Sequence, residues 1–320
     1  MNIVVLERNS VGVDIEIDMY EKFGEVTYYP NTVEAEVAKR VKDMDIAIIN
    51  KAPMNELTLK EAKDLKLICL FSTGYDNVDL DYCRSRGIKV ANVVNYSTDS
   101  VAQHTFALAF YLIEKLNFYD MYVKSGEYGS QSRFSNFDRS FMELEGKTWG
   151  IIGMGNIGKK VSKIATAFGC KVIFYSASGN NKETKYQRVD FDTLCEQSDV
   201  ISIHCPLSDR TKNIMNMDAF GKMKKSAILI NVARGPIVNE KDLAIALNEG
   251  MIAGAGLDVL EKEPISSNNP LNAIKDSTKL MITPHMAWAS LEARQRVVME
   301  VFNNMEAFLK GESRNVLNEP

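Results

Sequence analysis

Short apolar runs alternate with helical stretches along most of the chain. Over the first hundred residues, the apolar runs cover 3–6, 26–29, 46–49, 67–71 and 90–93. Between them lie segments in which apolar residues recur at helical spacing, for example 33–44. Strands that alternate with helices predict βα units and a parallel sheet.

A second series of apolar runs begins at Thr148. Its members cover 149–152, 172–175, 200–203, 228–231, 256–259 and 280–282. Runs this short, with apolar residues on both faces, are typical of strands buried between two helical layers. The two series therefore predict two separate α/β sheets.

Helices are predicted between and after the two series. Apolar residues fill a long helix over 101–116, and the mixed polar and aromatic stretch 120–145 predicts an arm or a connecting loop. A last helix, roughly 291–310, follows the second series. We expect it to pack back onto the first sheet, so the first domain would be discontinuous.

Composition and charge narrow the class of protein. A chain of 320 residues favours two domains, and 45% hydrophobic with 25% charged residues is typical of soluble proteins. The net charge of −4 gives no basic footprint for nucleic acid or for a membrane surface. The first apolar run is too short for a signal peptide, and no run is long enough to span a membrane. We therefore expect a cytoplasmic protein without a nucleic-acid or membrane partner.

Cysteine usage agrees with a reducing compartment. The five cysteines are odd in number, scattered and free of CxxC spacing, which predicts reduced thiols and no metal site. They are Cys69, Cys83, Cys170, Cys195 and Cys205.

A glycine-rich loop opens the second series. Gly153, Gly155 and Gly158 stand in a GxGxxG pattern that follows a predicted strand and precedes a predicted helix, 159–168. The first glycine permits a tight turn, the second lets a pyrophosphate approach the backbone, and the third lets helix and strand pack closely. The N–H groups of the helix N-terminus would bind the phosphates. The context favours a dinucleotide site over an ordinary glycine turn.

The next strand in this series bears on the choice of nucleotide. NAD sites usually carry an acid about 20 residues beyond the glycines, but here the strand 172–175 ends at Ser176. A serine can bond a ribose hydroxyl and does not repel a 2′-phosphate, which Ser176, Ser178 and Lys182 could contact. The loop contains no arginine, so the sequence favours NADH and leaves NADPH open.

Three charged or titratable residues follow later strands of the second series. A hydride transfer to a keto acid needs a cation for the substrate and an acid/base for the hydroxyl proton. Arg234, Glu263 and His285 each come after a predicted strand, at the sheet edge where open α/β sheets bind ligands. Each has an ordinary structural explanation by itself, and their common edge favours a catalytic set. For the other histidines, His104 and His204, a structural hydrogen bond is the preferred interpretation.

Several segments resemble one enzyme family. Residues 72–79, 96–105, 153–158, 231–235, 256–264 and 283–288 resemble the D-isomer-specific 2-hydroxyacid dehydrogenases, in the right order and over nearly the whole chain. The glycerate dehydrogenase (hydroxypyruvate reductase) branch looks most similar. The resemblance implies an α/β fold with two doubly wound parallel-sheet domains and a homodimer. A flavodoxin-like substrate domain would span 1–98 and 287–320, and a Rossmann NAD(P)-binding domain would span 99–286.

The resemblance also implies roles. Arg234 would bind the substrate carboxylate, His285 would be the acid/base, and Glu263 would orient it. Further substrate contacts would come from the backbone of one loop and from two pocket side chains: Ser72, Thr73, Gly74, Lys51 and Trp288. Asp258 would bond the nicotinamide amide, and Cys205 and Pro206 would line an adenine pocket. The full set of expected nucleotide contacts is Gly153, Gly155, Asn156, Ile157, Gly158, Ser176, His204, Cys205, Pro206, Val232, Ala233, Asp258 and His285.

The expected reaction is hydride transfer between a nicotinamide and a small 2-keto acid or D-2-hydroxy acid. Hydroxypyruvate/glycerate and glyoxylate/glycolate are the first candidates, and D-lactate or a larger side chain is the alternative. Formate and phosphite dehydrogenases share the scaffold of this family. The formate enzymes carry a glutamine at the position of Glu263, so Glu263 argues against a formate dehydrogenase. A non-catalytic NAD(H) sensor could dispense with the three-residue set, whose presence favours an enzyme.

Overall fold

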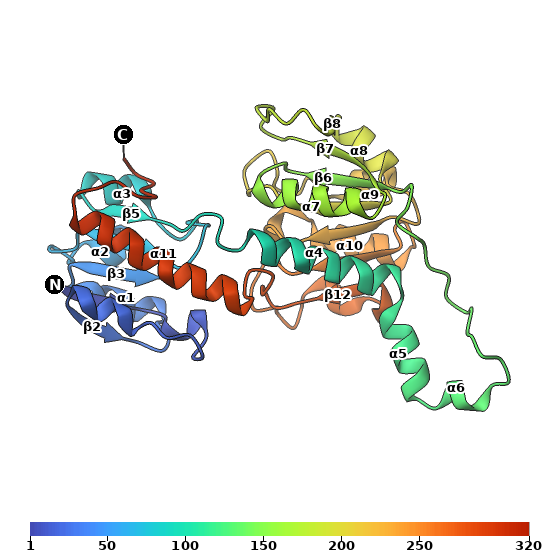
Figure 1. The fold of residues 1–320 in the computed structure, drawn as a ribbon, viewed down its shortest axis with the longest axis horizontal. Helices are drawn as coiled ribbons and strands as arrows, with labels where there is room; N and C mark the ends of the chain where they lie inside the picture. The colour runs from blue at the N-terminus through green and yellow to red at the C-terminus, as the bar shows by residue number, and fades with distance from the viewer. Residues whose placement is uncertain (320) are drawn as a thin grey trace. The chain divides into compact units, whose positions relative to one another are not determined.

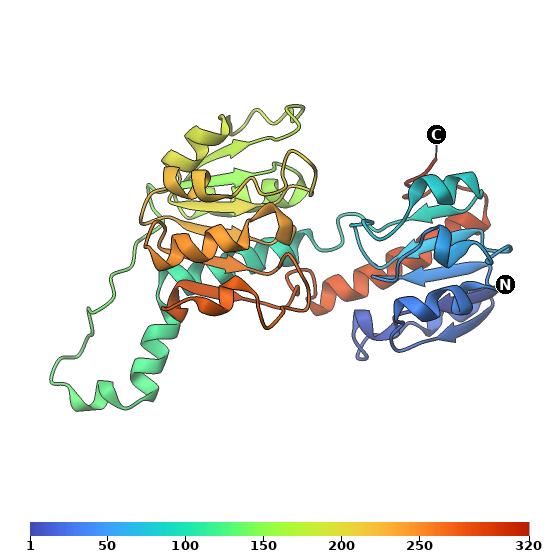
Figure 2. The same cartoon turned by 180° about the vertical axis from the view of Figure 1, so that it is seen from behind.

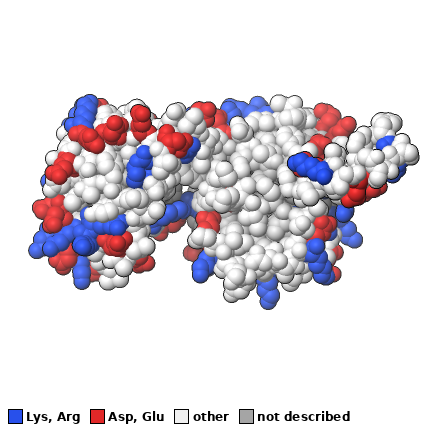
Figure 3. All heavy atoms as spheres, turned by 90° about the horizontal axis from the view of Figure 1, so that it is seen from below, with Lys and Arg blue, Asp and Glu red and all other residues white. Residues whose placement is uncertain are grey.

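A computed structural model describes residues 1–319. The chain divides into two compact units, Met1–Ser97 with Ala289–Pro320 and Thr98–Trp288 (Figures 1 and 2). On the face shown in Figure 3, basic and acidic side chains are interspersed. Within residues 1–319, no helix has both the length and the apolar character needed to cross a membrane.

The first unit is built on a five-stranded parallel sheet. Its strand order, β2-β1-β3-β4-β5, is that of flavodoxin-like folds. Two of its interior strands, β3 and β4, are apolar and buried throughout, as the short runs predicted. The strands are β1 (Asn2–Val5), β2 (Glu25–Tyr28), β3 (Ile46–Ile49), β4 (Leu67–Leu70) and β5 (Lys89–Ala91).

Four helices accompany this sheet: α1 (Glu34–Val41), α2 (Glu56–Leu59), α3 (Leu80–Ser85) and α11 (Leu291–Leu309). The last of them comes from the far end of the chain. The hydroxyl of Tyr20 donates to the carbonyl of Val298 at 3.0 Å, and the amide of Asn304 donates to the carbonyl of Asn92 at 2.9 Å. The C-terminal helix is therefore part of the first unit.

The second unit contains a seven-stranded parallel sheet in the order β12-β11-β10-β9-β6-β7-β8. The chain runs outward from β6 in one direction, then returns to β9 and runs outward in the other. The gap between β6 and β9 is thus the point where the strand order reverses, which is where such sheets bind ligands. The strands are β6 (Thr148–Ile152), β7 (Lys171–Tyr175), β8 (Gln187–Arg188), β9 (Val200–Ile203), β10 (Ile228–Asn231), β11 (Gly254–Leu257) and β12 (Leu280–Ile282).

Helices cover this second sheet: α4 (Thr98–Ile113), α7 (Asn156–Ala167), α8 (Phe191–Gln197), α9 (Met217–Lys222) and α10 (Glu240–Asn248). Trp149 of β6 is fully buried, and its ring lies 4.7 Å from that of Phe106 on α4. Helical cover of the sheet explains why its strands read as continuous apolar runs. The predicted fold of two doubly wound parallel sheets is confirmed.

Two strands differ from the prediction. The strand expected at 256–259 is Gly254–Leu257, so Asp258 follows the strand instead of lying within it. Small residues begin this strand because α4 packs closely over it: a Cβ on Gly256 would lie 3.0 Å from that of Leu108. The two-residue strand β8 was missed because Gln187 and Arg188 are polar and exposed.

The segment after α4 also differs. The predicted helix over 101–116 ends earlier, because Lys115 adopts a left-handed conformation (φ +56°). A separate helix, α5 (Leu116–Lys124), and a short turn, α6 (Glu127–Ser130), then form the first part of the predicted arm. Neither contains a buried residue, and both project from the second sheet in Figures 1 and 2.

Candidate active site

The glycine loop joins β6 to α7. Gly153 has φ +97°, and a Cβ there would lie 2.7 Å from the backbone nitrogen of Cys205. A Cβ on Gly158 would overlap the carbonyl oxygen of Gly153, whereas a Cβ on Gly155 would meet nothing within 4 Å. Packing therefore requires the first and third glycines, and the second leaves open space over the backbone.

The N-terminus of α7 faces this open space. Gly155 is its N-cap, and the first helical bond runs from Lys159 N to Gly155 O at 2.9 Å. The N–H groups of Ile157 and Gly158 therefore precede the first intrahelical bond, and the first turn contains no acid. Donors, dipole and space together fit a pyrophosphate.

His204 lies at the end of β9, across the reversal point from this loop. The Trp149 indole donates to the Ser202 hydroxyl at 2.8 Å, and His204 Nε2 lies 2.9 Å from the same hydroxyl. The Ser202 hydroxyl, which accepts from the indole, can give its own proton to His204 Nε2, and the ring proton then sits on Nδ1. Burial lowers the pKa of His204 to about 3, so the ring is neutral.

The second ring nitrogen of His204, Nδ1, makes no hydrogen bond within the described residues. This nitrogen is also buried. The structural hydrogen bond expected for this histidine thus accounts for one ring nitrogen only. The other nitrogen, buried and without a partner, is left for a ligand at the reversal point.

Arg234 follows β10 and is held by that strand's last residue. The buried Asn231 side chain donates to the Arg234 carbonyl at 2.9 Å and accepts from Ala233 N at 3.1 Å. A Cβ on Gly235 would overlap the backbone of Leu260, so this loop presses against the segment that leads to Glu263. Arg234 itself is half-buried, and its guanidinium donates to the Ala233 carbonyl at 2.8 Å.

Glu263 and His285 are in direct contact. His285 Nδ1 lies 2.6 Å from Glu263 Oε2, and Leu260 N donates to Glu263 Oε1 at 3.0 Å. The carboxylate is thus fixed from behind and fixes the ring in turn. Both side chains stay about one-third exposed or less, with 27% for His285 and 33% for Glu263.

Asp258 organises the loop that carries His285. This carboxylate is 2% exposed and accepts from Thr283 Oγ1 (2.6 Å), Met286 N (2.8 Å) and Ala287 N (2.8 Å). His285, inside the same loop, has a left-handed backbone (φ +54°), which costs energy unless its surroundings hold it. Asp258 supplies that hold.

Two further side chains join this loop. His104 Nε2 lies 2.9 Å from Thr283 Oγ1, so its structural hydrogen bond reaches the network around Asp258. The Trp288 indole donates to the His285 carbonyl at 3.0 Å. Sequence reasoning did not identify Asn231 or the positioning role of Asp258, although a polar residue at or just beyond the end of an apolar strand is a signal for both.

The expected substrate contacts of the first unit lie in two loops. Thr73 Oγ1 donates to the Val93 carbonyl at 2.6 Å, while the N–H groups of Thr73 and Gly74 donate to no acceptor within residues 1–319. In the other loop, the Glu7 carboxylate accepts from the N–H groups of Lys51 (2.8 Å) and both its neighbours. Glu7, which sequence reasoning missed, therefore sets the backbone at Lys51.

Comparison with known proteins identifies the family. Residues 106–287 match the model of the D-isomer-specific 2-hydroxyacid dehydrogenase NAD-binding domain. A hydroxypyruvate reductase from Blautia hydrogenotrophica is 39% identical over the full length of both chains. The chain belongs to the D-isomer-specific 2-hydroxyacid dehydrogenase family.

Other family members show the same relationship. A glycerate dehydrogenase from Methylorubrum extorquens is 39% identical and covers 98% of each chain. The crystal structure of a D-lactate dehydrogenase from Aquifex aeolicus, with NAD and lactic acid, superposes with a TM-score of 0.87 at 27% identity over both whole chains. The resemblance to this family is confirmed, and the chain is a nicotinamide-dependent oxidoreductase of 2-hydroxy acids.

Proposed function

We propose that this enzyme interconverts hydroxypyruvate and D-glycerate, and accepts glyoxylate as a smaller substrate. One observation carries the chemistry: the 2.6 Å contact between His285 and Glu263 lies on the sheet edge that also carries Arg234 and the glycine loop. The choice of substrate is supported by the relatives named hydroxypyruvate reductase and glycerate dehydrogenase.

Arg234 is proposed as the anchor of the substrate. A guanidinium can grip a carboxylate with two parallel hydrogen bonds and can polarise the neighbouring carbonyl. Asn231 and Gly235 hold its loop, so the grip is preorganised. The N–H groups of Thr73 and Gly74, with Ser72, are also proposed to bind the substrate, and Lys51 and Trp288 are proposed as pocket residues.

His285 is proposed as the acid/base. Its Nδ1 is committed to Glu263, which leaves Nε2 for the substrate oxygen. In reduction, Nε2–H gives its proton to the oxygen as the carbonyl carbon gains a hydride, and in oxidation Nε2 takes the hydroxyl proton back. When bound, the nicotinamide supplies or accepts that hydride. Glu263 orients the ring and balances the charge of the imidazolium.

The nucleotide is proposed to lie across the reversal point of the second sheet. Ile157 and Gly158, with Gly153, Gly155 and Asn156, would hold the pyrophosphate, and Ser176 would bond the ribose. The partnerless Nδ1–H of His204 is a further donor to the nucleotide. Asp258 has one lone pair left for the nicotinamide amide, and the remaining pocket walls would be Cys205, Pro206, Val232 and Ala233.

A reductase assay tests the substrate. Absorbance of the reduced nicotinamide is followed with hydroxypyruvate, glyoxylate, pyruvate and phenylpyruvate, with each nucleotide in turn. We expect the highest kcat/KM for hydroxypyruvate. A higher value for pyruvate or phenylpyruvate would assign the alternative, a D-lactate or larger-side-chain dehydrogenase. Tight nucleotide binding without turnover of any keto acid would point to a sensor.

The assembly is proposed to be a homodimer built on the arm over 120–145, whose first part contains α5 and α6. The arm carries exposed aromatic residues, with Phe134 89% and Phe137 74% exposed, and such apolar patches usually mark contact surfaces. A twofold mate would cover the same segment in both copies. Light scattering should give twice the chain mass of 35.9 kDa, and the variant Phe134→Ser/Phe137→Ser should shift it toward one chain. A wild-type mass of one chain would exclude the dimer.

Domain roles and location complete the proposal. Residues 1–98 with 287–320 are proposed as the substrate domain, and 99–286 as the nucleotide domain. A cytoplasmic location is supported by the five cysteines, all buried and free of disulfides. Cell fractionation checks it, and recovery outside the cytoplasm would overturn it.

A further inference from the structure

The turn after β7 is built unlike an NAD-selective site. Ser176 stands where an acid would accept from the ribose hydroxyls, and Gly179 N closes the turn onto Ser176 O at 3.1 Å. The hydroxyls of Ser176 and Ser178 lie 3.4 Å apart. Asn181 ties this turn to the glycine loop, because its amide donates to the Met154 carbonyl at 2.7 Å.

Two arginines from outside the turn converge on it. Arg188, on the edge strand β8, donates from Nη1 to the Gly179 carbonyl at 2.7 Å. Arg210, beyond β9, donates from Nη1 to the Ala177 carbonyl at 3.4 Å. Each guanidinium has five N–H groups, and each of these two contacts uses only one of them, so both arginines keep donors for a ligand. Neither arginine forms an ion pair within the part of the chain that the structure describes.

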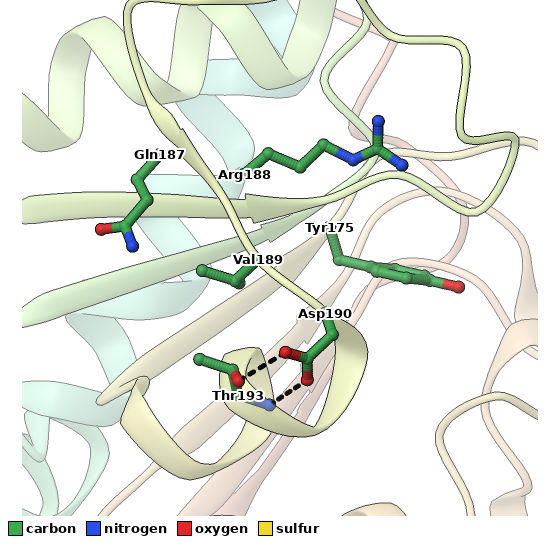
Figure 4. A pocket seen from close by; sticks show the side chains of 6 residues that line it. All are labelled: Tyr175, Gln187, Arg188, Val189, Asp190 and Thr193. Atoms are coloured by element: carbon green, nitrogen blue, oxygen red, sulfur yellow. Dashed lines mark hydrogen bonds between the residues drawn. The ribbon is translucent and has the colours of Figure 1, made fainter.

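The acids nearby are already committed. The carboxylate of Glu183 accepts from Lys185 N at 2.8 Å and pairs with Lys159 at 3.5 Å. Asp190 caps α8 by accepting from both the N–H and the hydroxyl of Thr193, as Figure 4 shows, while Arg188 extends away from it. Both carboxylates are turned to local structure, so the positive charge at the turn is left for an anion.

We propose that Ser176, Ser178, Arg188 and Arg210 form a 2′-phosphate site, so that the enzyme binds NADPH at least as tightly as NADH. This inference rests on the proposed placement of the nucleotide. A nucleotide phosphate carries nearly two negative charges, and planar guanidinium groups bind it in pairs of hydrogen bonds. Ser176 would still bond the 2′-hydroxyl of NADH, so the site does not exclude that nucleotide.

The position of the arginines explains why the sequence favoured NADH. No arginine lies in the loop directly after β7, which is the segment where the sequence pattern predicts contacts to a 2′-phosphate. Arg188 comes back to the turn along β8, and Arg210 reaches it from the neighbouring crossover. The arrangement of the strands brings both arginines to the turn, although they are distant from it in the sequence.

Nucleotide binding tests the proposal. Dissociation constants for NADPH, NADH and adenosine 2′,5′-bisphosphate are measured by fluorescence and competition for the wild type and for Arg188→Gln, Arg210→Gln and their combination. We expect each single change to weaken NADPH and the bisphosphate about tenfold, the worth of one charged hydrogen bond, and to leave NADH within about threefold. Lys225→Gln is the control, because it removes the same charge at the amino-terminal edge of β10.

The opposite change provides a second arm. Ser176→Asp should repel the 2′-phosphate, so it should weaken the binding of NADPH more than about tenfold relative to its effect on NADH. A wild type that binds NADPH far more weakly than NADH, or arginine variants that leave the NADPH constant unchanged, would overturn the proposal. Turnover of hydroxypyruvate with NADH is measured alongside, so that loss of the proposed reaction and loss of the phosphate site are read separately.

Discussion

The two halves of one edge of the seven-stranded sheet present different chemical groups. On the side of β6 and β7, the glycine loop and a helix N-terminus present backbone N–H groups, and the close approach of Gly153 and Gly158 to their neighbours sets the shape. On the side of β10 to β12, the groups proposed for chemistry are side chains. Buried polar residues hold them, namely Asn231 behind Arg234 and Asp258 behind His285.

This difference follows from what each side is proposed to bind. A pyrophosphate is a diffuse anion that several N–H groups and a helix dipole satisfy without a particular side chain. A proton and a carbonyl oxygen need one ring and one guanidinium at fixed positions, so each must be braced from behind. The nucleotide side should therefore be sensitive to added volume, and the reaction side to changes of functional group.

The largest expected effect is on the reaction side. His285→Gln keeps a polar side chain but removes the acid/base, and we expect kcat to fall on the order of 10²–10⁴-fold. The dissociation constant of the nucleotide should stay near its wild-type value. Stopped-flow turnover and nucleotide fluorescence measure the two quantities. Full activity in this variant would falsify the proposed mechanism.

Arg234→Lys should come next. Lysine keeps the charge but loses the planar fork, so KM for the keto acid should rise roughly tenfold to a hundredfold, with little change in nucleotide binding. Arg314→Lys in the other unit is a matched control. If KM and kcat of the Arg234 variant both match the wild type, Arg234 is not the carboxylate anchor.

The glycine pair separates binding from stability on the nucleotide side. Gly155→Ala projects a methyl group into open space, so it should weaken the nucleotide about tenfold and leave the melting temperature nearly unchanged. Gly158→Ala forces a methyl group against the Gly153 carbonyl, so it should destabilise the fold by about 1–3 kcal/mol. Thermal denaturation and nucleotide titration of both variants check this. Equal losses of stability would contradict the division of roles.

Glu263→Gln should give the smallest effect and the most specific one. Reduction starts from the imidazolium and fades as pH rises, whereas oxidation starts from the neutral ring and fades as pH falls. Without its counter-charge, the imidazolium is less favoured, so the acidic limb of oxidation should move to lower pH and reduction at neutral pH should slow by about tenfold. Unchanged pH profiles would remove the pairing of Glu263 with His285 and leave the acid/base role intact.

The sequence predicted most of the fold because its signals are local. Ten of the strands were placed from short apolar runs, and the GxGxxG pattern needed only a strand before it and a helix after it. Its misses have local causes as well. Gly254–Leu257 begins with residues too small to register as apolar, β8 is polar, and the left-handed Lys115 divides what reads as one helix.

For the site, the sequence determined which residue types follow which strands, because parallel strands bring their carboxyl ends to one edge. It thereby named Arg234, Glu263 and His285 before any geometry was known. Only the tertiary structure decided that Glu263 touches His285, that Asp258 braces the His285 loop, and that two distant arginines meet the turn after β7. The physical reason is that hydrogen bonds and charge contacts depend on ångström separations between segments far apart in the chain, which periodicity and motif spacing do not encode.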